Sequence, residues 1–216
     1  MEHQMKLTID YTRKAGTVRR LNGVNLAPPP IAEKASRDLS ADFAALRAPY
    51  ARLHDAPLEN GNMRLVDVPF LFGNCDADAA DKANYYFRQT DDYLATCRRC
   101  GSDIIYRLGV SIEHGIGRYY AFPPEDFEKW SDICVNIVRH YNEGWNDGFA
   151  WNIRYWEIWN EPDLAGNMWN APLERYFELY ALTAKKLKAR FPGIKVGGPA
   201  YASCDPGRIN AFLDAC

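Results

Sequence analysis

Apolar residues follow two spacings along the chain, one typical of strands and the other typical of helices. Short apolar runs predict five strands, over residues 18–25, 50–55, 102–109, 152–159 and 194–200. Between them, apolar positions three and four residues apart predict five helices, over residues 42–49 and 85–100, from Phe127 to Tyr141, from Pro172 to Phe191, and from Asp205 onward. Prolines and glycines mark several of the predicted helix ends, at Pro49, Gly101, Pro192 and Gly193.

This repeated order of strand and helix predicts an α/β fold with a parallel sheet and right-handed crossovers. No Gly-x-Gly-x-x-Gly follows the first strand, which disfavours a dinucleotide fold. Two long segments, 56–84 and 109–126, follow the second and third strands, at the ends where a (β/α)8 TIM barrel builds its active site. A complete barrel needs about 250 residues. The 216 residues therefore predict one domain, 1–216, that is an incomplete TIM barrel of about five βα units without strands 6 to 8, or an open sheet.

Composition and charge exclude some classes of partner. Hydrophobic residues make up 47% and charged residues 25% of the chain, as in ordinary globular domains. The net charge of −2, without a dense Lys/Arg cluster, argues against a nucleic-acid partner. No apolar run approaches the roughly 18 residues of a transmembrane helix, so we expect no membrane partner. The N-terminus has no signal-peptide core, and we expect a cytoplasmic location.

The six cysteines lack the closely paired spacings of a metal or disulfide framework. Cys97 and Cys100 form a Cys-x-x-Cys, but near the end of a predicted helix, whereas a reactive pair usually opens one. We therefore favour thiols that face the core or are incidental. The alternatives, redox chemistry or a zinc site, stay open, and our interpretation requires no cofactor or metal.

The fourth strand runs into polar residues in "IRYWEIWNEPDL" (153–164). Strand alternation places Glu157 and Glu161 on one side and Asn160 on the other. A charged residue inside a strand needs a partner, and for Glu157 the candidates are Arg52 and Arg107.

Glu161 differs from Glu157 because it stands at the strand's end, before Pro162. A carboxyl group beside tryptophans, partly removed from water, suits protonation of a glycosidic oxygen. From spacing alone, a loop glutamate without catalytic role is the favoured interpretation.

The segments around this strand resemble family 39 of the glycoside hydrolases, retaining enzymes with a (β/α)8 fold that include β-xylosidases and α-L-iduronidases. The resemblance runs from about Leu21 to the end and rests on five segments: "WEIWNEPD", "KVGGPA", "DFEKWSDICVNIVRHY", "YFELYALTAKKLK" and "ARLHD". It implies that Glu161 is the general acid/base and that Asn160 binds the 2-hydroxyl of the sugar. It also implies that His54 contacts the sugar in the −1 subsite and that Arg52 supports the site, although Arg52 could equally be a structural partner of Glu157.

Several loop aromatics could also meet a carbohydrate substrate. Trp169, Tyr119 and Tyr120 could stack on sugar faces or simply pack their loops. Glu113 and His114 are further possible contacts in the loop after the third strand.

The resemblance also implies that a second carboxylate is needed. The family's nucleophile is a glutamate at the end of strand seven, and no residue of this chain matches it. Asp163 is too near Glu161 in sequence, and Asp205 matches no known catalytic position. We therefore expect a retaining O-glycosyl hydrolase, acting on β-xylosides or related glycosides, whose N-terminal part alone is inactive.

Two alternatives remain: a non-catalytic carbohydrate-binding protein that keeps His54 and Asn160, and a small oxidoreductase centred on Cys97 and Cys100. The first and fifth strands of an incomplete barrel would be unpaired edges, which favour self-association.

Overall fold

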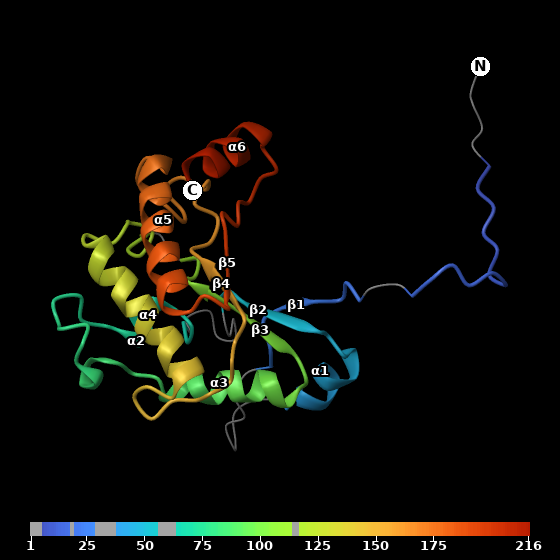
Figure 1. Cartoon of the computed structure of the whole chain (residues 1–216), viewed down its shortest axis with the longest axis horizontal. Coiled ribbons are helices and arrows are strands. Elements are labelled where there is room, and N and C mark those ends of the chain that lie inside the picture. The colour runs from blue at the N-terminus through green and yellow to red at the C-terminus, as the bar shows by residue number, and fades with distance from the viewer. Residues whose placement is uncertain (1–5, 18–19, 29–37, 56–63, 114–116) are drawn as a thin grey trace.

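The computed structural model describes residues 6–17, 20–28, 38–55, 64–113 and 117–216. Five strands alternate with helices along these residues (Figure 1). The strands are β1 (Val24–Asn25), β2 (Tyr50–Leu53), β3 (Asp103–Leu108), β4 (Tyr155–Ile158) and β5 (Lys195–Gly197). The helices are α1 (Ser40–Leu46), α2 (Val68–Leu71), α3 (Arg88–Arg99), α4 (Phe127–Glu143), α5 (Leu173–Arg190) and α6 (Pro206–Ala215), with a 3-10 turn, η2, at Lys82–Asn84.

The five strands form one parallel sheet in the order β1-β2-β3-β4-β5. The predicted α/β fold with an incomplete barrel is therefore confirmed. Each strand pairs with its neighbour in sequence, as in the first part of a barrel, and β1 and β5 are the edges of the described sheet.

The two faces of the sheet differ in chemistry. In β2, β3 and β4, the positions that alternate with the polar ones carry fully buried apolar side chains, among them Leu53, Tyr106, Leu108, Trp156 and Ile158. The helices cover this apolar face, and α4 and α5 pack against each other beside it (Figure 1). The opposite face carries Arg52, Arg107 and Glu157, and the register places Arg107 directly beside Glu157. The fold thus gathers ionisable groups on one side of the sheet.

Helix α4 shows why the helical pattern could be read from sequence. The Asp126 side chain caps it by accepting from the Lys129 backbone N–H at 2.9 Å, and Gly144, with φ 72°, ends it. Its predicted apolar face is buried, except that Phe127 is only partly covered. Ser131 of α4 lies 2.8 Å from Thr183 of α5, a polar contact inside the helix pair.

Several predicted boundaries were wrong. The fourth and fifth strands are shorter than predicted, at Tyr155–Ile158 and Lys195–Gly197. The described part of the first strand is only Val24–Asn25, because residues 20–23 run exposed beside the sheet edge. Helix α1 ends at Leu46, since Arg47 adopts a left-handed backbone with φ 48°. Helix α3 begins at Arg88 rather than at residue 85, because the backbone N–H of Tyr86 donates to the carbonyl of Leu71.

No helix in the described ranges is long and apolar enough to cross a membrane. Residues 6–17 are exposed and extend away from the sheet (Figure 1).

Candidate active site

The end of β4 departs from strand geometry. Trp159 has a left-handed backbone with φ 68°, and its N–H donates to the carbonyl of Leu108 at 2.7 Å. This turn ends the alternation of sides that holds up to Ile158. Asn160 therefore meets the same arginine as Glu157, so the prediction that these two side chains lie on opposite sides was wrong. Its error was to extend a two-residue period beyond the last residue of the strand.

Arg52 joins β2 to the end of β4. Its Nε donates to Glu157 Oε2 at 2.8 Å, and its Nη2 lies 2.5 Å from the same oxygen. The same Nη2 donates to Asn160 Oδ1 at 2.6 Å. The predicted ion pair of Glu157 is confirmed, with Arg52 as the partner. Since Arg52 occupies Oδ1, the buried Nδ2 of Asn160 is left without a hydrogen-bond partner in the described part of the chain.

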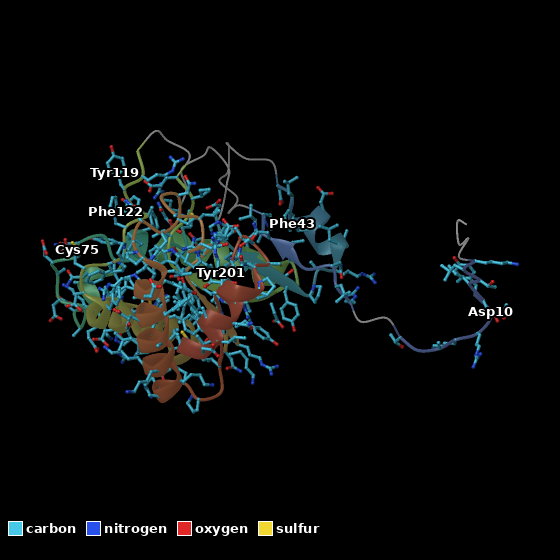
Figure 2. The ribbon with its side chains drawn as sticks, turned by 90° about the horizontal axis from the view of Figure 1, so that it is seen from above. Asp10, Phe43, Cys75, Tyr119, Phe122 and Tyr201 are labelled. Atoms are coloured by element: carbon cyan, nitrogen blue, oxygen red, sulfur yellow. The ribbon has the colours of Figure 1, made fainter. Side chains whose placement is uncertain are left out.

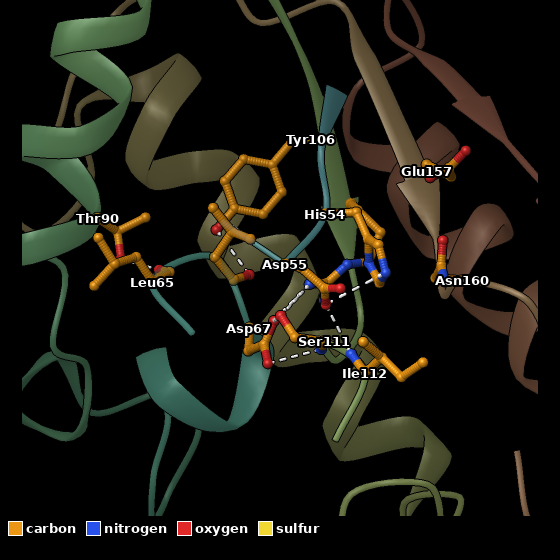
Figure 3. Close-up of polar contacts among 12 residues, drawn as sticks. His54, Asp55, Leu65, Asp67, Thr90, Tyr106, Ser111, Ile112, Glu157 and Asn160 are labelled. Atoms are coloured by element: carbon orange, nitrogen blue, oxygen red, sulfur yellow. Dashed lines mark hydrogen bonds and ion pairs between the residues drawn. The ribbon is translucent and has the colours of Figure 1, made fainter. Parts of the chain in front are cut away.

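Arg107, the other candidate for Glu157, belongs to a different network. Its Nη2 donates to Asp67 Oδ1 at 2.5 Å and to Ser111 Oγ at 3.2 Å, and its side chain is fully buried. Asp67 in turn accepts from the Ser111 backbone N–H and hydroxyl, each at 2.8 Å (Figure 3). Asp67 and Ser111 could not be predicted from the sequence, because each lies in a segment without strand or helix periodicity.

His54 follows β2 and is 8% exposed. Burial, and then the charges of Arg107 and Arg52, lower its pKa to about 2, so the ring is neutral at ordinary pH. In Figure 3 the ring points toward the end of β4, where Asn160 lies. Its Nε2 is 3.4 Å from Asp55 Oδ1, and its Nδ1 has no hydrogen-bond partner among the described residues. A neutral ring that donates from Nε2 to Asp55 presents Nδ1 as an acceptor.

Glu161 lies half-buried at the tip of this strand end. Its backbone N–H donates to the carbonyl of Ala200 at 2.9 Å, which ties it to the loop after β5. Asp163 strengthens that tie, because its carboxylate accepts from Ala202 and Ser203. The Glu161 carboxylate itself makes no hydrogen bond or ion pair with the described residues, so it is available to a ligand. Asp163, by contrast, is fully used in holding the loops together.

The loop after β3 carries the predicted aromatic contacts. The Tyr120 backbone N–H donates to the buried carboxylate of Glu113 at 2.7 Å, and the guanidinium of Arg64 lies 4.6 Å from the centre of the Tyr120 ring. Tyr120 is 43% exposed and Tyr119 is 81% exposed. Figure 2 shows Tyr119 at the outer edge of the molecule. His114 lies outside the described residues.

Trp169 does not belong with these rings. It is 1% exposed, its ring packs edge-on against Trp159 at 5.1 Å, and its Nε1 donates to the carbonyl of Pro172. It has no open face for a sugar, so the interpretation of Trp169 as a stacking residue is corrected to a core role beneath the site.

The cysteines lie away from this chemistry. Cys97 and Cys100 are both buried and are not joined by a disulfide, and burial raises the pKa of the Cys97 thiol to about 12. A reactive Cys-x-x-Cys needs the opposite shift, which contradicts the oxidoreductase alternative. The described ranges contain no group of three or more His, Cys, Asp or Glu side chains placed to hold a metal ion.

Comparison with known proteins agrees with this geometry. Residues 78–216 match the sequence profile described as "Glycosyl hydrolases family 39". A β-xylosidase from Geobacillus stearothermophilus is 39% identical over 97 residues, which are 44% of this chain and 18% of that protein. The crystal structure of a glucosidase from Croceicoccus marinus is similar with a TM-score of 0.75 and 27% identity, covering 91% of this chain and 41% of that one. A monomeric β-xylosidase from Caulobacter crescentus, at 22% identity and a TM-score of 0.62, supports the fold over 89% of this chain and 38% of its own.

The sheet and its polar strand ends define part of an α/β barrel of the glycoside hydrolase class. The chain belongs to family 39 of the glycosyl hydrolases, because the family profile covers more than half of it. It spans less than half the length of each of these three relatives.

Proposed function

We propose that this chain carries the acid/base half of a retaining O-glycosyl hydrolase that acts on β-xylosides. Glu161 would protonate the leaving-group oxygen and then remove a proton from the incoming water. Asn160 would donate from Nδ2 to a sugar hydroxyl, and His54 would accept from another through Nδ1. Arg52 would position Asn160 rather than bind the sugar, since its contacts go to Glu157 and Asn160.

One observation carries the proposal most. At the end of β4, the Glu161 carboxylate, which has no partner among the described residues, stands next to the Asn160 amide. The carbonyl oxygen of that amide is already held by Arg52, so its N–H groups are left for a ligand. A buried donor without a partner is unfavourable in the free protein, and a sugar hydroxyl would satisfy it. The β-xylosidase name of the Geobacillus relative supports the choice of sugar, while the glucosidase name of the Croceicoccus structure makes a glucoside the comparison to test.

The nucleophile of a retaining mechanism stands about 5 to 5.5 Å from the acid/base. The carboxylates closest to Glu161 in sequence are engaged elsewhere, Glu157 by Arg52 and Asp163 by the loop after β5. The resemblance to family 39 implies a nucleophile at the end of strand seven, whereas the described sheet has five strands, so we expect the isolated chain not to turn over substrate.

The first experiment separates binding from turnover. An aryl β-xyloside titrated into the isotope-labelled chain should shift the side-chain amide resonance of Asn160 and the ring resonances of His54, without release of the aryl group. The Asn160→Ala variant should lose the His54 shift, whereas Glu161→Gln should keep it. An aryl β-glucoside serves as the matched ligand, and a stronger response to it would change the assigned sugar.

Two results would contradict the proposal. Release of the aryl group by the wild-type chain but not by Glu161→Gln would show that the nucleophile is within these residues. The absence of any shift at His54 and Asn160 would remove the binding role. Binding that persists without hydrolysis in a protein extended by any downstream coding sequence would favour the alternative, a non-catalytic carbohydrate-binding protein that uses the same His54 and Asn160.

A further inference from the structure

A groove with a volume of about 890 Å³ lies apart from the strand-end site. Its lining comes from residues 70–91 and 140–147, between the end of α2, the start of α3 and the end of α4. The lining includes none of Arg52, His54, Asn160 and Glu161. The groove and the strand-end site therefore share no residue.

The inner wall of the groove is rigid. His140, 1% exposed, lies with Nδ1 2.9 Å from the carbonyl of Trp145 and Nε2 3.0 Å from Asp91 Oδ1. Its ring stacks on Phe87 with 3.6 Å between the centroids and 3° between the planes. A wall held by two hydrogen bonds and a stacked ring is preformed, as small-molecule sites usually are.

The outer edge of the groove carries side chains that have no hydrogen-bond or stacking partner within the described residues. Tyr86 is 64% exposed. Its ring stacks on no other ring and its hydroxyl makes no hydrogen bond within the described residues. The side chains of Gln89 and Asp147 likewise make no hydrogen bond or ion pair within the described residues. A single exposed ring is ordinary on a protein surface, but an exposed ring that borders a groove beside a free amide and a free carboxylate is a combination that suits a ligand.

The combination selects a class of ligand. A flat aromatic face takes the C–H side of a sugar ring, while the amide of Gln89 and the carboxylate of Asp147 can bind its hydroxyls. The carboxylate of Asp91 is hydrogen-bonded to His140, and the guanidinium of Arg88 is paired with Asp92. The lining therefore offers no group of unpaired like charges that would attract an ion of the opposite sign. A neutral saccharide fits these features better than an anion or a cation.

We propose that this groove is a second saccharide-binding site, with Tyr86 as its stacking platform. Because the chain's proposed substrate is a β-xyloside, the ligand to test is a β-linked xylo-oligosaccharide, and only this choice of sugar rests on the proposed function. A site there would hold a polymeric substrate through residues that do not belong to the strand-end site.

The test is a titration of xylotetraose into the isotope-labelled full chain, followed by NMR. The expected result is a shift of the amide resonances of Tyr86, Gln89 and Asp147, with the Trp145 indole resonance as a neighbouring reporter. Tyr86→Ala should weaken the dissociation constant for these shifts about tenfold, and Tyr86→Phe, which keeps the ring, should change it little. Gln89→Ala, at another exposed position, should weaken it in the same direction.

Two control variants distinguish sugar binding in the groove from sugar binding at the strand ends. Tyr119→Ala removes a tyrosine that is also exposed, in another loop, and should leave the groove shifts unchanged. Asn160→Ala should also leave them unchanged, whatever it does to resonances near β4. The proposal is overturned if the groove resonances do not move up to about 10 mM sugar, or if their shifts survive Tyr86→Ala. Loss of the groove shifts in Asn160→Ala would overturn it too, since the sugar would then be bound at the strand ends.

Discussion

Arg52 binds Glu157 and Asn160 at the same time, so these three side chains cannot be moved independently of one another. The sequence narrowed the partner of Glu157 to two arginines because strand alternation puts both on the polar face. The sequence could not distinguish the two arginines, because the choice depends on Asp67. Asp67 forms an ion pair with Arg107 but lies 40 positions from it, in a segment without periodicity. Hydrogen-bond partners far apart in sequence leave no local pattern.

His54 gives a prediction at this scale. The folded protein holds the ring neutral down to a pKa of about 2, whereas the unfolded chain takes up a proton below about 6.5. The unfolded state therefore binds more protons as the pH falls, and the free energy of unfolding decreases by roughly 1.4 kcal/mol per pH unit below that point. In His54→Gln the titrating group is absent, so this decrease in the free energy of unfolding does not occur. The free energy of unfolding of His54→Gln minus that of the wild type should therefore rise by about 2 kcal/mol from pH 7 to pH 5.

Urea unfolding at the two pH values measures this difference. Asn160→Ala, a neighbouring change that removes no titrating group, is the control and should keep the wild-type dependence on pH. Parallel curves for wild type and His54→Gln would show that the ring is not held neutral.

At the scale of elements, the sequence predicted most where the pattern is local. The prediction of helix α4 began at the observed first residue, Phe127, and ended at Tyr141, close to the observed Glu143, because its burial follows a regular period. The five parallel strands were also found, since each is an apolar run between helices. The end of β4 was misread because Trp159 leaves the strand with a positive φ, which no periodicity predicts. The start of α3 was misread because a contact with Leu71, distant in sequence, keeps Tyr86 extended.

Gly109 connects two of these elements. A Cβ at this position would lie 2.9 Å from Trp159 Cα and 3.3 Å from Arg107 Cδ, so the end of β3 can pass β4 only without a side chain. We expect Gly109→Ala to lower the free energy of unfolding by about 1 to 3 kcal/mol. It should also shift the Asn160 side-chain amide resonance, because Asn160 follows Trp159 directly.

Gly193→Ala is the matched control for this change, since its Cβ would meet nothing within 4 Å. Its stability should stay within about 0.5 kcal/mol of wild type. Equal urea midpoints for the two variants would mean that the close passage of β3 and β4 does not constrain the site.

At the scale of the whole molecule, the polar residues of the site come from β2, β3 and β4, the inner strands of the sheet, while β1 and β5 form its edges (Figure 1). Two ion pairs, of Arg52 with Glu157 and of Arg107 with Asp67, leave this face with balanced charge. These groups thus lie on the inner strands of the described sheet, although the chain spans less than half the length of its three relatives.

The sheet edges have a consequence that can be measured. Backbone N–H and C=O groups along β1 and β5 have no strand beside them within the described residues. Such edges pair with other chains, so we expect the mass from sedimentation velocity to rise with protein concentration. A monomer of constant mass over a wide concentration range, with one cooperative thermal transition, would contradict an open sheet in solution.

The hydrogen bond from Arg52 to Asn160 also determines which atoms near the end of β4 are left as donors and acceptors for a ligand. Asn160 Oδ1 already accepts from Arg52, so its Nδ2 is the group left to bind a ligand, as a donor. If the neutral His54 ring donates from Nε2 to Asp55, 3.4 Å away, its Nδ1 is an acceptor. On the proposed function, the two residues would then distinguish the lone pairs of a bound hydroxyl from its proton. Fluorine, which accepts weakly but has no proton to give, is compatible with the amide side of the site and not with the imidazole side, so replacing one hydroxyl at a time would read out the orientation of the sugar.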